Sequence, residues 1–168
     1  DYLELLGLPP GAENPRKDIA EAPVGINGLV FKTTDADATF AHMQALGIAG
    51  DPPKSFSRPV KLPEGEKDAA FRTVTVRPGV FPGGRVYFCE HHTPDLVWRP
   101  EWQLHANGAR GITSMTIAVD NPEPLISAYE KLFGAGSCSP TDDTLAAFTG
   151  QPAISVPCGF TEGGLPIG

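Results

Sequence analysis

Side chains that can hold a metal ion or a substrate alternate along one predicted strand in the middle of the chain. Tyr87, Cys89 and His91 lie within residues 85–91, and alternate residues of a strand point to the same face of a sheet. An imidazole on that face can bind a metal or act as a base, and it can activate a neighbouring thiol as a nucleophile. Alternatively, His91 is a hydrogen-bonded structural residue and Cys89 is a buried, unreactive thiol.

Two tryptophans enclose an arginine a few residues further on. Arg99 stacked on Trp98 or Trp102 can bind a substrate carboxylate, because the guanidinium fork matches two oxygens. Alternatively, the two indoles pin this connection to the sheet, and Arg99 pairs with Glu101 or Asp95.

Three further polar residues each have two interpretations. Glu4 is flanked by leucines, and because an isolated buried carboxylate is costly, it either faces a binding site or lies at an exposed edge. His105 and Asn107 lie in a loop rich in small residues, where they line the mouth of a site or make turn hydrogen bonds.

A strand followed by a capped helix occurs twice and predicts the scaffold. A β-branched strand over residues 25–34 precedes Asp35, a good N-cap, and a helix over 36–46 that ends at Gly47. A second strand over 111–119 precedes a helix that runs to residue 133. Two candidate caps and a proline in the first turn mark the start of this second helix: Asp120 or Asn121, and Pro122.

A connection rich in proline and glycine and then a hairpin separate the two strand–helix units. Residues 70–76 alternate as a strand, residues 78–84 form a turn, and residues 85–91 return. The order β-α-β-β favours a mixed α+β sheet over a parallel α/β sheet.

Composition narrows the possible functions. The chain has 168 residues, a net charge of −7 and 40% hydrophobic residues, enough to bury a core. No apolar stretch is long enough to cross a membrane, and the acidic balance without a basic run argues against nucleic acid. Three cysteines without CxxC spacing and the lack of a visible secretory leader favour reduced thiols in the cytoplasm.

Residues 86–109 resemble the glyoxalase-like domain proteins of the vicinal oxygen chelate superfamily, and residues 2–5 and 57–59 resemble the same group. The resemblance covers about residues 1–135 and implies an α+β fold in which βαβββ units form a half-open mixed sheet around a site. We divide the chain into five segments. Residues 1–23 hold the last strand of a truncated first unit and a linker, 24–92 the central unit, 93–110 a Trp-rich connection, 111–149 a partial further unit and 150–168 a tail.

The resemblance also implies a divalent metal ion (Zn, Fe, Mn or Ni). Glu4 matches the carboxylate-ligand position, His91 is a second ligand or a catalytic base, and Cys89 stands where the matching carboxylate would be. The histidines that the family carries in its first strands fall on Gly28 and Ser114, so the implied ligand set is incomplete. The substrate-binding residues expected around this centre are Tyr87, Cys89, Trp98, Arg99, Trp102, His105 and Asn107.

The tail, residues 150–168, resembles a segment of the amidase signature family. That family's Ser-Ser-Lys machinery is not found, so we expect no amide hydrolysis, although residues 154–156 can form a short strand. We also interpret both ends of the chain as cut within strands.

Three functions remain open at this stage. The chain is a metal-dependent lyase, isomerase or dioxygenase acting on a small oxygenated molecule, a non-catalytic module that binds such a molecule, or an incomplete fragment that dimerises through open strand edges. The partners we expect are a small-molecule ligand and a second copy of the chain in a homodimer, and neither nucleic acid nor a membrane.

Overall fold

The computed structural model describes residues 4, 11, 17–21, 26, 28–81, 84–112, 114–141, 153–157, 159–160 and 166–167. Its helices are α1 (Lys17–Ala20), α2 (Ala36–Ala45) and α3 (Pro122–Phe133), with short 3-10 helices η1 (Pro94–Leu96) and η2 (Pro100–Trp102). Its strands are β1 (Gly28–Thr33), β2 (Lys54–Leu62), β3 (Gly65–Thr75), β4 (Arg85–His91), β5 (Ser114–Ala118), β6 (Ser139–Thr141), β7 (Ala153–Pro157), β8 (Gly159–Phe160) and β9 (Pro166–Ile167).

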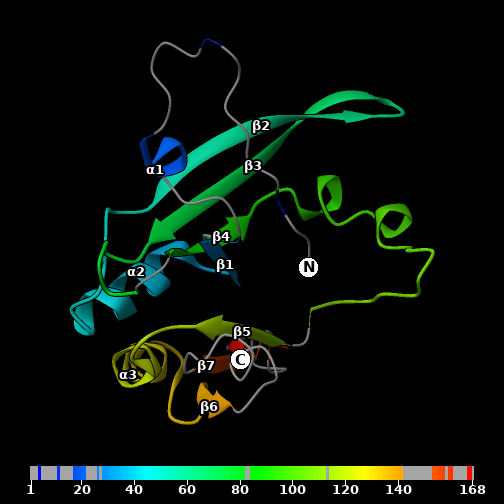
Figure 1. The fold of residues 1–168 in the computed structure, drawn as a ribbon. Coiled ribbons are helices and arrows are strands. Elements are labelled where there is room, and N and C mark those ends of the chain that lie inside the picture. The colour runs from blue at the N-terminus through cyan, green and yellow to red at the C-terminus, as the bar shows by residue number, and fades with distance from the viewer. Residues whose placement is uncertain are drawn as a thin grey trace.

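The main sheet has four strands in the order β1-β4-β3-β2 (Figure 1). β1 runs parallel to β4, and the other two pairs are antiparallel. With α2 between β1 and β2, this is a complete βαβββ unit in an open mixed sheet. The predicted α+β class is confirmed.

β2 was not predicted, because residues 54–62 were read as part of the connection. The strand nevertheless pairs with β3 from Lys54 opposite Thr73 to Leu62 opposite Gly65. Pro59 lies inside it and has no N–H to donate. β2 is an edge strand, so the missing donor leaves no gap in the ladder.

The first helix of the repeated pattern forms as predicted. The Asp35 side chain accepts a hydrogen bond from the Ala38 N–H at 2.9 Å, and Gly47 follows the helix with a positive φ of 69°. α3 begins after Asn121, whose side chain makes no cap hydrogen bond, and ends at Gly134 with φ 97°.

α2 and α3 both contribute to one core on one face of the main sheet. Phe31 of β1 lies 4.6 Å from Phe133 of α3, measured between ring centroids, and Phe81 lies at the same distance from Tyr129. The cluster of buried residues also includes Met43, Val74, Val86, Phe88, Leu125 and Leu132.

A second sheet has the order β5-β7-β6, and both of its pairs are antiparallel (Figure 1). β7 confirms the short strand expected in the tail. Among the described residues, no helix has the length and apolar character needed to cross a membrane.

Candidate functional site

One face of the main sheet is turned away from α2 and α3, which pack against the other face. Val86 and Phe88 of β4 belong to the core beneath α2 and α3, as predicted. Because neighbouring residues of a strand point to opposite faces, Tyr87, Cys89 and His91 share the other face. We call this the open face of the sheet, meaning the face opposite α2 and α3, although Cys89 on it is buried.

Three rings form a row across the open face. His91 lies opposite Phe71 in the pairing of β4 with β3, and their ring centroids are 5.0 Å apart, edge to face. Phe71 lies opposite Phe56 of β2, and these rings stack at 5.3 Å. We call Phe56, Phe71 and His91 the aromatic row. Trp98 adds a fourth ring 5.5 Å from His91.

His91 is a neutral imidazole at pH 7. Burial, and secondarily the positive charge of Lys32, lowers its pKa below the ordinary value of 6.5. Its Nδ1 atom is buried without a hydrogen-bond partner among the described residues. A buried N–H without an acceptor is rarer than a buried acceptor without a donor. This favours the tautomer with the proton on Nε2, which leaves His91 a donor for an oxygen.

Cys89 is a protonated thiol. Burial, followed by the charges of Glu4 and Glu90, raises its pKa to about 11. Thiolates are the reactive form of cysteine, so this side chain is a poor nucleophile and a poor metal ligand near neutral pH. The geometry therefore matches the alternative of a buried, unreactive thiol.

Glu4 lies close enough to β4 for its charge to act on Cys89, and its residue is exposed. Its position therefore has features of both alternatives, a residue near a binding site and a residue exposed to solvent. It borders the residues of the open face and is accessible to solvent.

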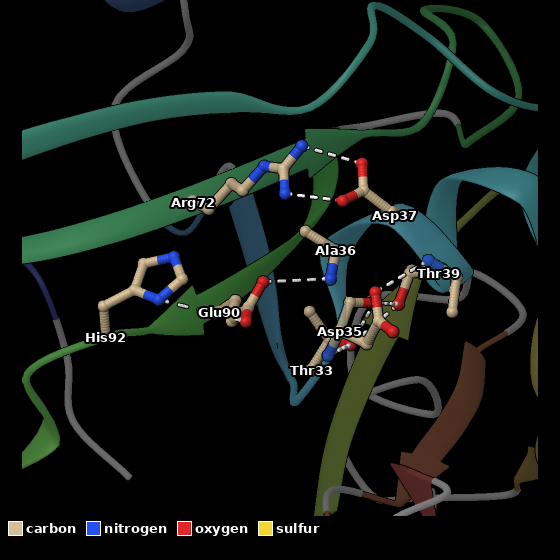
Figure 2. A network of polar contacts seen from close by, with 9 residues as sticks. Thr33, Asp35, Ala36, Asp37, Thr39, Arg72, Glu90 and His92 are labelled. Carbon is tan, nitrogen blue, oxygen red and sulfur yellow. Dashed lines mark hydrogen bonds and ion pairs between the residues drawn. The ribbon is translucent and has the colours of Figure 1, made fainter.

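On the opposite face, β4 is fixed to α2 by polar contacts (Figure 2). Glu90 Oε2 accepts a hydrogen bond from the Ala36 N–H at 3.0 Å. The Arg72 guanidinium donates to both carboxylate oxygens of Asp37, at 2.6 and 2.7 Å. Because His91 follows Glu90 directly, the helix that contacts Glu90 also helps to fix the backbone that carries His91.

The structure pairs Arg99 with two carboxylates of this chain. Its Nη1 donates to Glu64 at 2.7 Å, its Nε donates to Glu101, and its guanidinium lies 5.5 Å from the centroid of the Trp102 ring. Glu64 belongs to the turn between β2 and β3. Arg99 therefore ties the Trp-rich connection to that hairpin, and the predicted pairing with Glu101 is confirmed.

His105 and Asn107 are both exposed and lie in a turn. Asn107 Oδ1 accepts from the Ala109 N–H at 3.1 Å, and the His105 carbonyl accepts from the Gly108 N–H at 2.9 Å. These contacts match the turn-forming alternative, and a role at the mouth of a site stays a prediction.

A metal ion fits the described residues poorly. No group of three or more His, Cys, Asp or Glu side chains that could hold one occurs in the part of the chain that the structure describes. Glu4 and His91 remain two separate predicted ligands. Gly28 and Ser114, the positions matched to first-strand histidines, open β1 and β5 and supply no ligand side chain of that type.

Lys32, Phe56 and Phe71 lie on the open face and were not among the predicted site residues. Phe56, Val60 and Leu62 fall on one parity, and this spacing of apolar residues is a strand signal that could have revealed β2 and its ring. Pro59 in the same segment argued against it. Lys32 carried no signal, because a single lysine in a strand is usually a solvated residue.

The comparison with family models places the chain in a family. The model of the glyoxalase-like domain matches residues 1–133, and the chain therefore belongs to the glyoxalase-like domain family. No curated protein matches the chain, and no solved structure matches it. None of these comparisons supports the likeness of residues 150–168 to amidase signature proteins.

Proposed function

We propose that this glyoxalase-like domain binds a small oxygenated organic molecule on the open face of its main sheet. The observation that carries the proposal is the aromatic row, in which a neutral imidazole stands beside two phenyl rings. The rings offer an apolar surface to a planar or aliphatic ligand body. His91 offers one hydrogen-bond donor to its oxygen.

The same observations support binding more strongly than catalysis by the chain alone. The thiol of Cys89 is protonated at neutral pH, and Arg99 is already paired with two carboxylates. A neutral His91 can accept a proton, but the described residues offer it no second acid or base in contact. Of the three alternatives, a module that binds a small molecule therefore accounts for most of the site.

The binding test uses 2-naphthol as a neutral oxygenated probe, with backbone amide chemical shifts as the readout. We expect saturable shifts in β3 and β4. Truncating Phe56 to alanine should weaken binding about fivefold, because one ring–ring contact is worth about 1 kcal/mol. The matched control is Leu104→Ala, since Leu104 is 83% exposed in the Trp-rich connection. Equal loss in both variants, or no shifts on the open face, contradicts the proposal.

A metal-dependent lyase, isomerase or dioxygenase is the second candidate. Its support is the family itself, together with a carboxylate, Glu4, that acts on the strand carrying His91. Metal analysis of protein purified without chelator tests it. One equivalent of Zn, Fe, Mn or Ni that is lost in both Glu4→Gln and His91→Gln supports this candidate. Less than a tenth of an equivalent in the unmodified chain rejects it.

The predicted oligomeric state and cellular compartment are also part of this proposal. A homodimer would form through β1 or β2, the outer strands of the main sheet in the part of the chain that the structure describes. The cytoplasm is the compartment in which the cysteines of this chain would stay reduced.

A further inference from the structure

Charged side chains are segregated between the two faces of the main sheet. The pairing register and the alternation of side chains divide the strands β1–β4 into two sets. The set on the helix side contains every carboxylate of these strands: Glu66, Asp68 and Glu90. The set on the open face contains none, and its charged members are all basic: Lys32, Lys54, Arg58, Lys67 and Arg85. This basic surface occurs on a chain whose net charge is −7.

The basic residues border the aromatic row on both sides. Lys32 lies opposite Cys89, and Lys54 lies opposite Thr73, which itself pairs with Cys89. These residues form one line across the sheet, two positions before His91 on β4. Arg58 lies two positions beyond Phe56 on β2. Two positions along a strand span about 7 Å. A ring on the aromatic row can therefore place an attached group within reach of a cation.

Within the described chain, these cations differ in how far they are neutralised. Lys54 pairs with Asp51 at 2.7 Å, and the Arg58 guanidinium lies 5.4 Å from the centroid of the Phe56 ring. Lys32 has no ion-pair partner among the residues that the structure describes. The pKa of Glu64 is lowered first by its hydrogen bond from Arg99 and also by the charge of Lys67. The charges of Glu4 and Glu90 also reach this region, since both add to burial in raising the pKa of Cys89. On the helix side, by contrast, Arg72 is held by Asp37.

A second copy of the chain is a poor occupant of this surface. Two identical faces related by a two-fold axis would bring the same basic residues together. Like charges that face each other across an interface oppose association. The charge pattern requires an occupant that is negative, and the aromatic row requires one with an apolar body.

We propose that the ligand of the open face is a small aromatic carboxylate. This inference rests on the proposed binding function and narrows it to a chemical class. The aromatic body of the ligand lies on the row Phe56–Phe71–His91. The carboxylate accepts the Nε2 proton of His91 in a hydrogen bond and is stabilised by the charge of Lys32 or Arg58.

Three probes separate this inference from the binding proposal itself: 2-naphthoate, 2-naphthamide and a ten-nucleotide oligothymidylate, each titrated while backbone amide shifts are recorded. We expect naphthoate to bind on the open face at least about fivefold more tightly than naphthamide, the gain of one charge-assisted contact. Lys32→Gln and Arg58→Gln should reduce this preference. Lys61→Gln should not, because Lys61 is on the same strand as Arg58 but on the opposite face. The preference should also fall as sodium chloride is raised.

Two results overturn the inference while the binding proposal stands. One is equal affinity for naphthoate and naphthamide on the open face. The other is an unchanged preference in both Lys32→Gln and Arg58→Gln. Tighter binding of the oligothymidylate than of naphthoate overturns it in favour of a nucleic-acid surface. If no aromatic probe shifts the open face, the binding proposal and this inference both fail.

Discussion

The environment of Cys89 decides what chemistry β4 can perform. Burial and two carboxylates keep the thiol protonated to about pH 11. Its spacing from His91 suggests a reactive thiol, but the fold makes Cys89 a buried, protonated side chain of the sheet. The sequence predicts the face that Cys89 shares with Tyr87 and His91, because alternation alone determines it. It cannot predict the depth of burial, which depends on what lies on that face.

The first prediction concerns the thiol. Glu4→Gln should lower the pKa of Cys89, because it removes one of the charges that disfavour the thiolate. The measurement is the pH dependence of Cys89 alkylation in a Cys138→Ala, Cys158→Ala background. Glu21→Gln is the control, as Glu21 is exposed and exerts no charge effect on Cys89. An unchanged Cys89 pKa in Glu4→Gln would remove Glu4 from the neighbourhood of the site.

The same thiols make stability depend on alkaline pH. The pKa values of Cys89 and Cys138 are both about 11 in the folded chain, against 9.0 without the fold. Between these values the unfolded state has lost the protons that the folded state keeps. The free energy of unfolding should therefore fall as pH rises from 9 to 11. Urea denaturation at several pH values measures it, and a smaller fall is expected in Cys89→Ala.

His91 provides the second residue-scale prediction. Its pKa lies below 6.5 in the folded chain, so stability should decrease as pH falls from 6.5 toward the folded-state value. Lys32→Gln should move the pKa of His91 upward, because the charge of Lys32 is the second cause of the shift. Imidazole proton shifts measured against pH report both effects, and Lys61→Gln serves as control. A His91 pKa at or above 6.5 in the unmodified chain would contradict the claim that burial keeps this imidazole neutral.

At the scale of elements, α2 depends on contacts from the sequence next to it and from the sheet. Asp35 caps its first turn, a contact that the local sequence predicts. Glu90 and Arg72 hold the same turn from strands β4 and β3 (Figure 2). Those two contacts join residues far apart in the chain, so no local pattern could have revealed them.

Replacing the cap should destabilise the domain. Asp35→Ala leaves the Ala38 N–H without its acceptor and should reduce the free energy of unfolding by about 1 kcal/mol. Asp51→Ala removes a carboxylate from an exposed ion pair and should have a clearly smaller effect, because solvent screens that pair. Chemical denaturation of the two variants gives the comparison. Equal losses would mean that α2 does not depend on its cap.

β2 shows why part of the candidate site could not be predicted from the sequence. Phe56, Val60 and Leu62 fall on one parity, as in a strand, but Pro59 and the preceding prolines match a loop. The position of β2 at the edge of the sheet resolves the conflict, and edge position is a property of the assembled sheet. Because β2 was not predicted, Phe56 at one end of the aromatic row was not predicted as a site residue either.

At the scale of the whole molecule, α3 belongs to the core of the main sheet. Leu125 is 1% exposed, and Phe133 contacts Phe31 of β1. The sequence predicts the strand–helix repeat but not this packing, because the two copies are separated by the hairpin and the Trp-rich connection.

Leu125→Ala should therefore destabilise the entire βαβββ unit. Emptying a fully buried leucine site costs about 2–5 kcal/mol. Circular dichroism and the fluorescence of Trp98 and Trp102 should lose their signals in one transition, shifted to lower temperature. Two separate transitions, with the tryptophan signal unshifted, would show that α3 and the sheet fold independently.

The most direct test of the account is to locate a bound ligand on the sheet. Intermolecular nuclear Overhauser effects between 2-naphthol and the ring protons of the protein report contacts shorter than about 5 Å, the range of aromatic stacking. We predict contacts to Phe71 and His91 on the open face. Contacts confined to Trp102 and Leu104, whose side chains are exposed in the Trp-rich connection, would contradict the account.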